Sequence, residues 1–141
     1  MFKCSCLCGD VEFKIRANPS QAINCHCRYC RKSHGAPYVT VLVVLPENYE
    51  ITKGTEKLCR LPSDKEKTGR YICSSCGSKL FTETAPGLPI SVHASALVNE
   101  DLVKAMAHTN VGSKCPTVVI QDELPQFDGS ITKEDYMELV V

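Results

Sequence analysis

Apolar and polar residues alternate along this chain in short segments, and few stretches have helical spacing. Residues 11–17 place an apolar side chain at every second position with charged residues between, which predicts a half-buried strand. Residues 38–45 are almost wholly apolar and largely β-branched, which predicts a central strand. Further strands are expected over residues 49–52, 55–61, 70–73, 79–84 and 90–95. Breaks are expected at Gly54, at residues 62–64 and 86–87, and at Pro89.

Helical patterns are fewer and shorter. Residues 27–33 have the length for one or two turns, and residues 132–139 begin with Thr132 as an N-cap followed by acidic residues, which predicts a C-terminal helix. Residues 100–107 have helical composition, with a loop as the alternative. The pattern as a whole predicts a mainly β class, and the length predicts one domain over residues 1–141.

Composition is that of a globular chain, with 141 residues of which 43% are hydrophobic. A chain of this size buries about two-thirds of its unfolded surface, so it can form a core without disulfides. No apolar run reaches the ~18 residues of a membrane span. The first residues contain no apolar segment typical of a secretory signal, so we expect a cytoplasmic protein. An extracellular disulfide protein with its signal removed is the alternative, which the C-x-C spacings disfavour.

The formal net charge is zero, from 16 basic and 16 acidic residues. If seven cysteines bind two zinc ions as thiolates, the charge falls to about −3. The net charge therefore does not indicate a nucleic-acid or anionic-membrane partner, and any affinity for anions must come from a local group of basic residues.

Seven of the ten cysteines fall into three groups whose short spacings suit zinc. The groups are Cys6 with Cys8, then Cys25, Cys27 and Cys30, and finally Cys73 with Cys76. Zinc prefers four tetrahedral ligands, so seven cysteines predict one closed site and one site with an open position. A closed site indicates a structural role, and an open site indicates chemistry.

We interpret the two pairs as the structural site. In an extended C-x-C segment, side chains two residues apart point the same way, which brings Cys6 and Cys8 together. Cys73 and Cys76 stand in a C-S-S-C-G turn. Spacing alone leaves other pairings open, and one pair could be buried free thiols. Cys4 is an alternate ligand of this zinc or a bystander thiol.

The triplet is the candidate for chemistry. Alternation turns His26 away from the metal, whereas His34 is an alternative fourth ligand from the next helical turn. Without it, the fourth position is open to water or to a ligand thiol. Three thiolates on Zn²⁺ carry a net charge of −1, which suits the binding of a further thiol as thiolate.

Cations lie beside the triplet. Arg28, Arg31 and Lys32 could hold the carboxylates of a small anionic thiol, and the alternative is an ordinary solvated basic face. The other cysteines and histidines are assigned mainly structural roles. Cys59 is expected in a core strand and Cys115 in an exposed loop, while His93 and His108 are structural or line the open site.

Several motifs together resemble the glutathione-dependent formaldehyde-activating enzyme family, which includes the centromere protein V-like proteins. They are CLCG at residues 6–9, CHCRYCRK at 25–32, Gly35, CSSCGS at 73–78, His108, SK at 113–114 and LPQFD at 124–128. The resemblance covers essentially the whole chain. It implies an Mss4-like fold, a twisted β-sheet domain pinned by zinc.

The same resemblance implies two zinc ions of unequal character. A structural zinc maps to Cys6, Cys8, Cys73 and Cys76, and a more labile zinc maps to Cys25, Cys27 and Cys30. The family's reaction adds glutathione to formaldehyde to give S-(hydroxymethyl)glutathione, a carbon–sulfur lyase activity in the reverse sense.

Two functions follow as hypotheses. The first is a zinc enzyme in which Cys25, Cys27 and Cys30 form the catalytic centre, glutathione is the co-substrate, and a small thiol and an aldehyde are the partners. The second is a non-catalytic, zinc-stabilised module that binds glutathione or a macromolecular partner. The sequence leaves the aldehyde and the oligomeric state open.

Overall fold

The computed structural model describes residues 1–62 and 68–140 and is mainly β. The chain forms two compact units. The first comprises residues 1–18 and 42–102, and the second comprises residues 19–41 and 103–141. Strand β4 (Val39–Val44) begins in the second unit and ends in the first.

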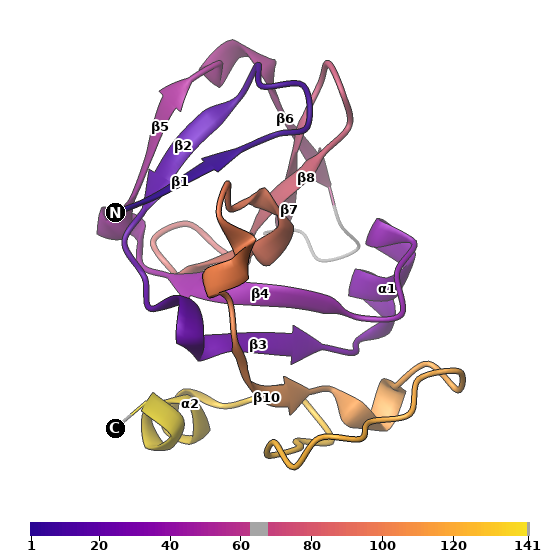
Figure 1. The fold of residues 1–141 in the computed structure, drawn as a ribbon. Helices are drawn as coiled ribbons and strands as arrows, with labels where there is room; N and C mark the ends of the chain where they lie inside the picture. Colours follow the sequence, from indigo (N-terminus) through magenta and orange to yellow (C-terminus); the bar gives the residue numbers. More distant parts are fainter. Residues whose placement is uncertain (63–67, 141) are drawn as a thin grey trace. The chain divides into compact units, whose positions relative to one another are not determined.

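The first unit contains a small antiparallel sheet in which β2 (Glu12–Ile15) lies between β1 (Phe2–Ser5) and β5 (Tyr49–Lys53) (Figure 1). Phe13 and Ile15 of β2 are fully buried, as the alternation predicts. The strand is shorter than the predicted segment 11–17. The strand β1 was not predicted from the sequence.

The same unit contains four antiparallel strands in the order β9-β8-β7-β6. They are β6 (Leu58–Pro62), β7 (Gly69–Cys73), β8 (Lys79–Glu83) and β9 (Ile90–His93). Phe81 of β8 links these strands to the small sheet, because its ring lies 5.7 Å from that of Phe13 and 5.9 Å from that of Tyr49. Tyr71 of β7 stacks on Phe81 at 4.7 Å, so aromatic contacts form the centre of this core.

Short 3₁₀ turns replace parts of the predicted strands. The segment 55–61 begins with η3 (Thr55–Lys57) and is a strand only from Leu58, and residues 94–96 form η4 (Ala94–Ala96) after β9. Another turn, η2 (Pro46–Asn48), follows β4. Pro62, predicted as part of a break, is instead the last residue of β6 and pairs with Gly69, whereas Ser63 and Asp64 of the same predicted break lie outside the described residues.

The second unit has β3 (Ala22–Cys25) between β4, which is antiparallel to it, and β10 (Ala105–Thr109), which is parallel to it (Figure 1). A short turn η1 (Pro19–Gln21) precedes β3, and α1 (Arg28–His34) follows it. The fully buried strand β3 has no polar alternation, so its pattern did not predict it.

The prediction of a helix over residues 100–107 is wrong. Only η5 (Glu100–Leu102) is helical, and it is a 3₁₀ turn. The next residues form β10, where Ala107, His108 and Thr109 are buried. Pairing with β3 outweighs the helical preference of alanine and methionine there.

The C-terminal helix is confirmed as α2 (Lys133–Val140). The Asp135 N–H donates to Thr132 Oγ1 at 3.0 Å, and the Thr132 N–H donates to Asp135 Oδ2 at 3.2 Å. This reciprocal pair satisfies two backbone donors at the start of the helix, as a capping box does.

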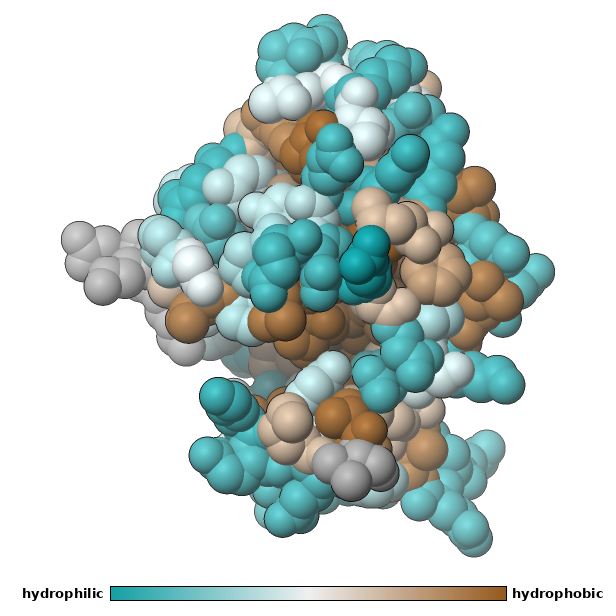
Figure 2. Space-filling model, turned by 90° about the vertical axis from the view of Figure 1, so that its left-hand side faces the viewer, coloured by the Kyte–Doolittle hydropathy of each residue, from teal (hydrophilic) through white to brown (hydrophobic). Residues whose placement is uncertain are grey.

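The surface mixes polar and apolar residues, and Figure 2 shows brown, apolar side chains between larger teal areas. Exposed apolar side chains include Leu7, Val98 and Val119. Among the described residues, no helix combines the length and the apolar character that crossing a membrane requires.

Candidate metal centres

The first cysteine cluster brings together four sulfur atoms from distant parts of the first unit. The Sγ atoms of Cys6, Cys8, Cys73 and Cys76 all lie within 4.8 Å of one another. Cys6 Sγ is 3.6 Å from Cys8 Sγ, and Cys8 Sγ is 3.8 Å from Cys73 Sγ. Zn–S bonds of about 2.3 Å in a tetrahedron place sulfurs about 3.8 Å apart, so this cluster fits a zinc ion.

Two tight turns present these sulfurs. Gly77 adopts a φ of 76°, a left-handed conformation that favours glycine, and its N–H donates to Cys73 O at 2.8 Å. The Leu7 N–H donates to Ser78 Oγ at 2.8 Å and so joins turns that are 71 residues apart. The Val11 N–H donates to Cys6 Sγ at 3.2 Å. The backbone therefore holds both turns in place around the sulfurs.

The Cys76 thiol has a lower pKa than an ordinary cysteine and therefore loses its proton more readily. Its Sγ lies 3.3 Å from Ser78 Oγ, and the hydrogen bond between them lowers the pKa of Cys76 to about 5. Zinc binds thiolates rather than thiols, so a low pKa favours binding at neutral pH. Within residues 1–62 and 68–140, this is the one group with four candidate ligands.

The second cluster lies where β3 meets α1. The Sγ atoms of Cys25, Cys27 and Cys30 lie within 4.8 Å of one another, which again fits a single zinc ion. Cys27 caps α1, because the Cys30 N–H donates to Cys27 Sγ at 3.3 Å. Asn110 Nδ2 donates to Cys25 Sγ at 3.6 Å.

The close spacing of the three cysteines favours the binding of a cation. The pKa of Cys30 is raised, first by its hydrogen bonds to Cys25 and Cys27 and then by burial. The pKa of Cys25 is also raised, first by its hydrogen bond to Cys27 and further by burial, although its hydrogen bond to Cys30 acts in the opposite direction. Three negative charges this close repel one another, whereas a divalent ion would stabilise all three thiolates. Three donors leave one tetrahedral position for another ligand.

The predicted basic residues all belong to α1 but differ in their contacts. Arg28 and Lys32 are exposed and stand one turn apart, so their side chains share one side of the helix. Arg31 donates from Nε to His26 O at 3.3 Å and from Nη2 to Ser113 O at 2.7 Å. Arg31 therefore ties α1 to η6 (Val111–Ser113) while keeping its charge near the cluster.

A chain of hydrogen bonds connects the buried His26 and His108 with the exposed Asp122. Its Nε2 lies 2.8 Å from His108 Nδ1, and His108 Nε2 lies 2.9 Å from Asp122 Oδ2. In the neutral form of His108, the carboxylate accepts from Nε2–H, and Nδ1 accepts from His26 Nε2–H. His26 Nδ1 is then a bare lone pair, in keeping with its lack of a hydrogen-bond partner. Burial lowers the pKa of His26, which keeps the ring neutral.

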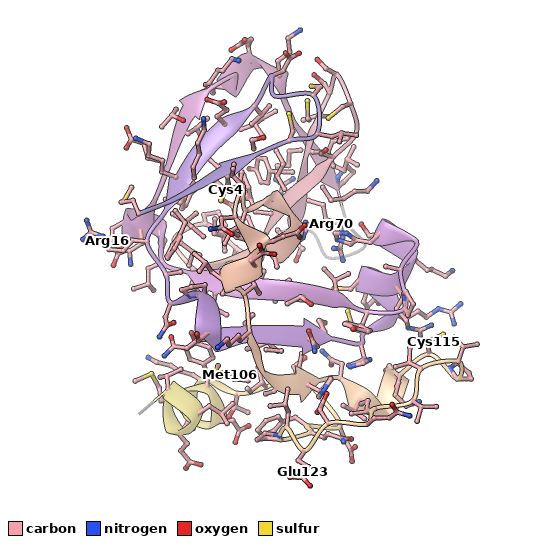
Figure 3. The ribbon with its side chains drawn as sticks, in the orientation of Figure 1. Cys4, Arg16, Arg70, Met106, Cys115 and Glu123 are labelled. Atoms are coloured by element: carbon pink, nitrogen blue, oxygen red, sulfur yellow. The ribbon has the colours of Figure 1, made fainter. Side chains whose placement is uncertain are left out.

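The other predicted residues lie outside both clusters. Cys4 of β1 is fully buried (Figure 3), and burial raises the pKa of its thiol to about 12. Cys59 is half-buried in β6, and His93 is buried with its Nε2 3.4 Å from Thr82 Oγ1. Cys115 lies in the loop after η6 (Figure 3), where its Sγ is 3.1 Å from Thr117 Oγ1. His34 does not join the three-cysteine cluster.

Sequence reasoning missed two side chains that contact these groups, Asn110 and Asp122. Asn110 is 85 residues from Cys25, and Asp122 follows His108 in a loop without regular structure. No spacing in the sequence connects them with the cysteines. The one available signal was that Asn110 is followed by Val111-Gly112, and asparagine is common in left-handed turns.

Comparison with known proteins shows the family and supports the fold. The sequence profile of the family described as "Glutathione-dependent formaldehyde-activating enzyme" matches residues 1–113. A crystal structure of a Rhodobacter sphaeroides protein is similar in fold, with a TM-score of 0.61 and 22% identity over 73% of this chain and 98% of that one. The likeness, the β architecture and the cysteine clusters confirm the predicted fold class. The chain belongs to the glutathione-dependent formaldehyde-activating enzyme family.

Proposed function

We propose that this protein is a zinc-dependent carbon–sulfur lyase-type enzyme that adds glutathione to formaldehyde or a related aldehyde. The observation that carries the proposal is the inequality of the two clusters, with four sulfurs gathered in one and three in the other. A four-sulfur site is complete, whereas a three-sulfur site has room for a substrate thiol. The name of the family to which the chain belongs contains the same two reactants.

The four-cysteine cluster has a structural role in this proposal. Its ligands come from the start of the chain and from the turn between β7 and β8, so a bound zinc would cross-link segments about 70 residues apart. Metal binding of this kind contributes directly to folding free energy, because the unfolded chain has no preformed site.

The three-cysteine cluster would bind the reacting thiol. When bound, zinc would keep the sulfur of glutathione as thiolate near neutral pH. Cys25, Cys27 and Cys30 supply the three thiolates that hold the metal. Arg28 and Lys32 are exposed on α1, the helix that also carries Cys30, and would pair with the carboxylates of glutathione.

Arg31 would act differently from the other two cations. Its bonds to His26 O and Ser113 O hold the guanidinium in one place, so its positive charge stays beside the cluster. A fixed positive charge favours the additional negative charge that a fourth thiolate brings.

The reaction balances without an oxidant or a reductant. The sulfur forms a bond to the aldehyde carbon, the carbon–oxygen π bond breaks, and the thiol proton ends on the oxygen. The product is a hemithioacetal, which for formaldehyde is the S-hydroxymethyl derivative of the thiol. Thiols add to formaldehyde readily without help, so the protein's contribution is to position the two reactants and to keep the sulfur ionised.

Stopped-flow measurement of formaldehyde consumption tests the proposal. We expect the zinc-loaded wild type to exceed the uncatalysed rate at saturating glutathione, and Cys27→Ser to fall to that rate while retaining one zinc. Cys115→Ser is the matched control, because it removes a thiol outside both clusters and should keep the wild-type rate.

Equal rates of formaldehyde consumption for wild type and Cys27→Ser would refute the proposed enzymatic activity. If glutathione binding measured by calorimetry nevertheless depended on Cys27, the non-catalytic binding module would replace it. Replacing both Arg28 and Lys32 by alanine should raise KM for glutathione more than it lowers kcat, because these side chains contact the carboxylates rather than the reacting atoms.

A further inference from the structure

Asn110 is an unusual residue beside the three-cysteine cluster. Its φ of 57° and ψ of 37° are left-handed, and among the described residues it is the one non-glycine residue with positive φ. Asparagine tolerates this conformation better than most residues, but it still costs free energy relative to glycine. A strained position next to a candidate site suggests that its side chain serves the site.

The sheet register places Asn110 next to Cys25. Strands β3 and β10 run parallel with Thr109 opposite Cys25, so the residue after Thr109 lies beside the start of the cluster. Thr109 Oγ1 donates to Gly129 O at 3.1 Å and accepts from the Ile131 N–H at 2.9 Å. The end of β10 is therefore fixed by the chain that follows it.

Hydrogen bonds also orient Asn110 itself. Its N–H donates to Gly129 O at 2.9 Å, and its O accepts from the Ser113 N–H at 3.0 Å. Its side-chain Oδ1 accepts from Ser130 Oγ at 3.3 Å. With Oδ1 occupied in this way, the amide Nδ2 is directed to Cys25 Sγ, 3.6 Å away.

We propose that Asn110 is a positioning residue that donates a hydrogen bond to the Cys25 thiolate and tunes it as a metal ligand. The inference rests on the metal centre of the proposed function but not on its turnover. A donor aimed at a thiolate stabilises the sulfur lone pair and fixes the direction of the sulfur toward the metal. Cys27 Sγ accepts a hydrogen bond from the Cys30 backbone, and Cys25 accepts one from the Cys27 backbone and a second, side-chain bond from Asn110.

Two substitutions separate the amide from the backbone conformation. Asn110→Gly removes the amide and accepts a positive φ without strain, so β10 and η6 should keep their structure. Asn110→Asp keeps the size and the tolerance for this conformation but replaces the N–H donor with an acceptor oxygen. Groups that orient metal ligands typically change metal affinity by about 10- to 100-fold when they are removed.

Cobalt substitution tests the proposal with readouts other than activity. Metal-free protein is titrated with Co²⁺, and the sulfur-to-cobalt charge-transfer band of the second equivalent is recorded. We expect that band to move to lower energy in Asn110→Gly, because the sulfur lone pair is no longer stabilised, and to move further in Asn110→Asp. The affinity for the second equivalent should fall about tenfold in Asn110→Gly and further in Asn110→Asp. The spectrum of the first equivalent, assigned to the four-cysteine cluster, should not change.

The outcomes are distinguishable. If the wild type takes two Co²⁺ and both variants match its band and affinity, the role of Asn110 is refuted and the metal centre stands. If the wild type takes one Co²⁺, both the three-cysteine centre and the role of Asn110 are refuted. A falling affinity with an unmoved band in both variants would indicate general loosening and would also overturn the proposal.

Discussion

Gly54 offers the sharpest structural prediction, because the backbone of another segment approaches it closely. It lies between β5 and η3 with a φ of 77°. A Cβ atom there would overlap Asp10 O and lie 3.1 Å from Val11 Cα, whereas real Cβ atoms essentially never come within 3.0 Å of a heavy atom outside their own and adjoining residues. Asp10 and Val11 follow the first cysteine turn, whose sulfur at Cys6 accepts from the Val11 N–H.

The loss of stability expected for Gly54→Ala is the sum of two free-energy costs. The left-handed conformation costs alanine about 1 kcal/mol relative to glycine. Forcing a methyl group against a backbone carbonyl costs about 3 kcal/mol, the upper end for overpacking, because the backbone rather than a flexible side chain must move. The sum of about 4 kcal/mol corresponds to a fall in Tm of roughly 10–15 °C for a chain of this size.

Gly87→Ala is the matched control. Gly87 has a φ of 80°, but an added Cβ would meet nothing within 4 Å, so only the conformational term applies. Calorimetry of the zinc-loaded variants should therefore show Gly54→Ala losing about 3 kcal/mol more than Gly87→Ala. Equal losses would show that the contact between Gly54 and Asp10 does not exist in solution.

Two further predictions concern residues outside the clusters. Cys4→Ser should destabilise the protein by about 1–3 kcal/mol, because it buries a hydroxyl, and should leave the zinc content unchanged; loss of a zinc would make Cys4 a ligand. Asp122 has its pKa lowered from 3.8, first by its hydrogen bond with His108. Its contribution to stability is therefore present above the unfolded pKa and lost as pH falls through the folded pKa. Asp122→Asn should be less stable than wild type at pH 7, and in denaturant titrations the two should converge as pH falls through the folded pKa of Asp122; parallel curves at every pH would contradict the pairing.

The cysteine clusters were predictable because their ligands come in short, local spacings. A C-x-C or C-x-x-C segment brings its own sulfurs together, whatever the rest of the chain does. The pairing of Cys6 and Cys8 with Cys73 and Cys76 was one of several that spacing allowed, and the structure brings these four sulfurs together.

The missed features depend on contacts between distant segments. The composition of residues 100–107 predicts a helix, with a loop as the alternative. The strand β10 forms in this region because it pairs with β3. Asn110 and Asp122 contact Cys25 and His108 only after the second unit has folded. The local sequence pattern does not indicate which distant residues come into contact, so only the structure shows these pairs.

The central claim is that seven cysteines form one closed zinc site and one open zinc site. X-ray absorption at the zinc edge tests it directly, because it counts sulfur ligands. Protein loaded with two zinc ions should show about 3.5 sulfur atoms per zinc on average, since seven sulfurs serve two ions. The average should rise to about four when glutathione is added. Binding of a single zinc, or four sulfurs per zinc before glutathione is present, would contradict the account.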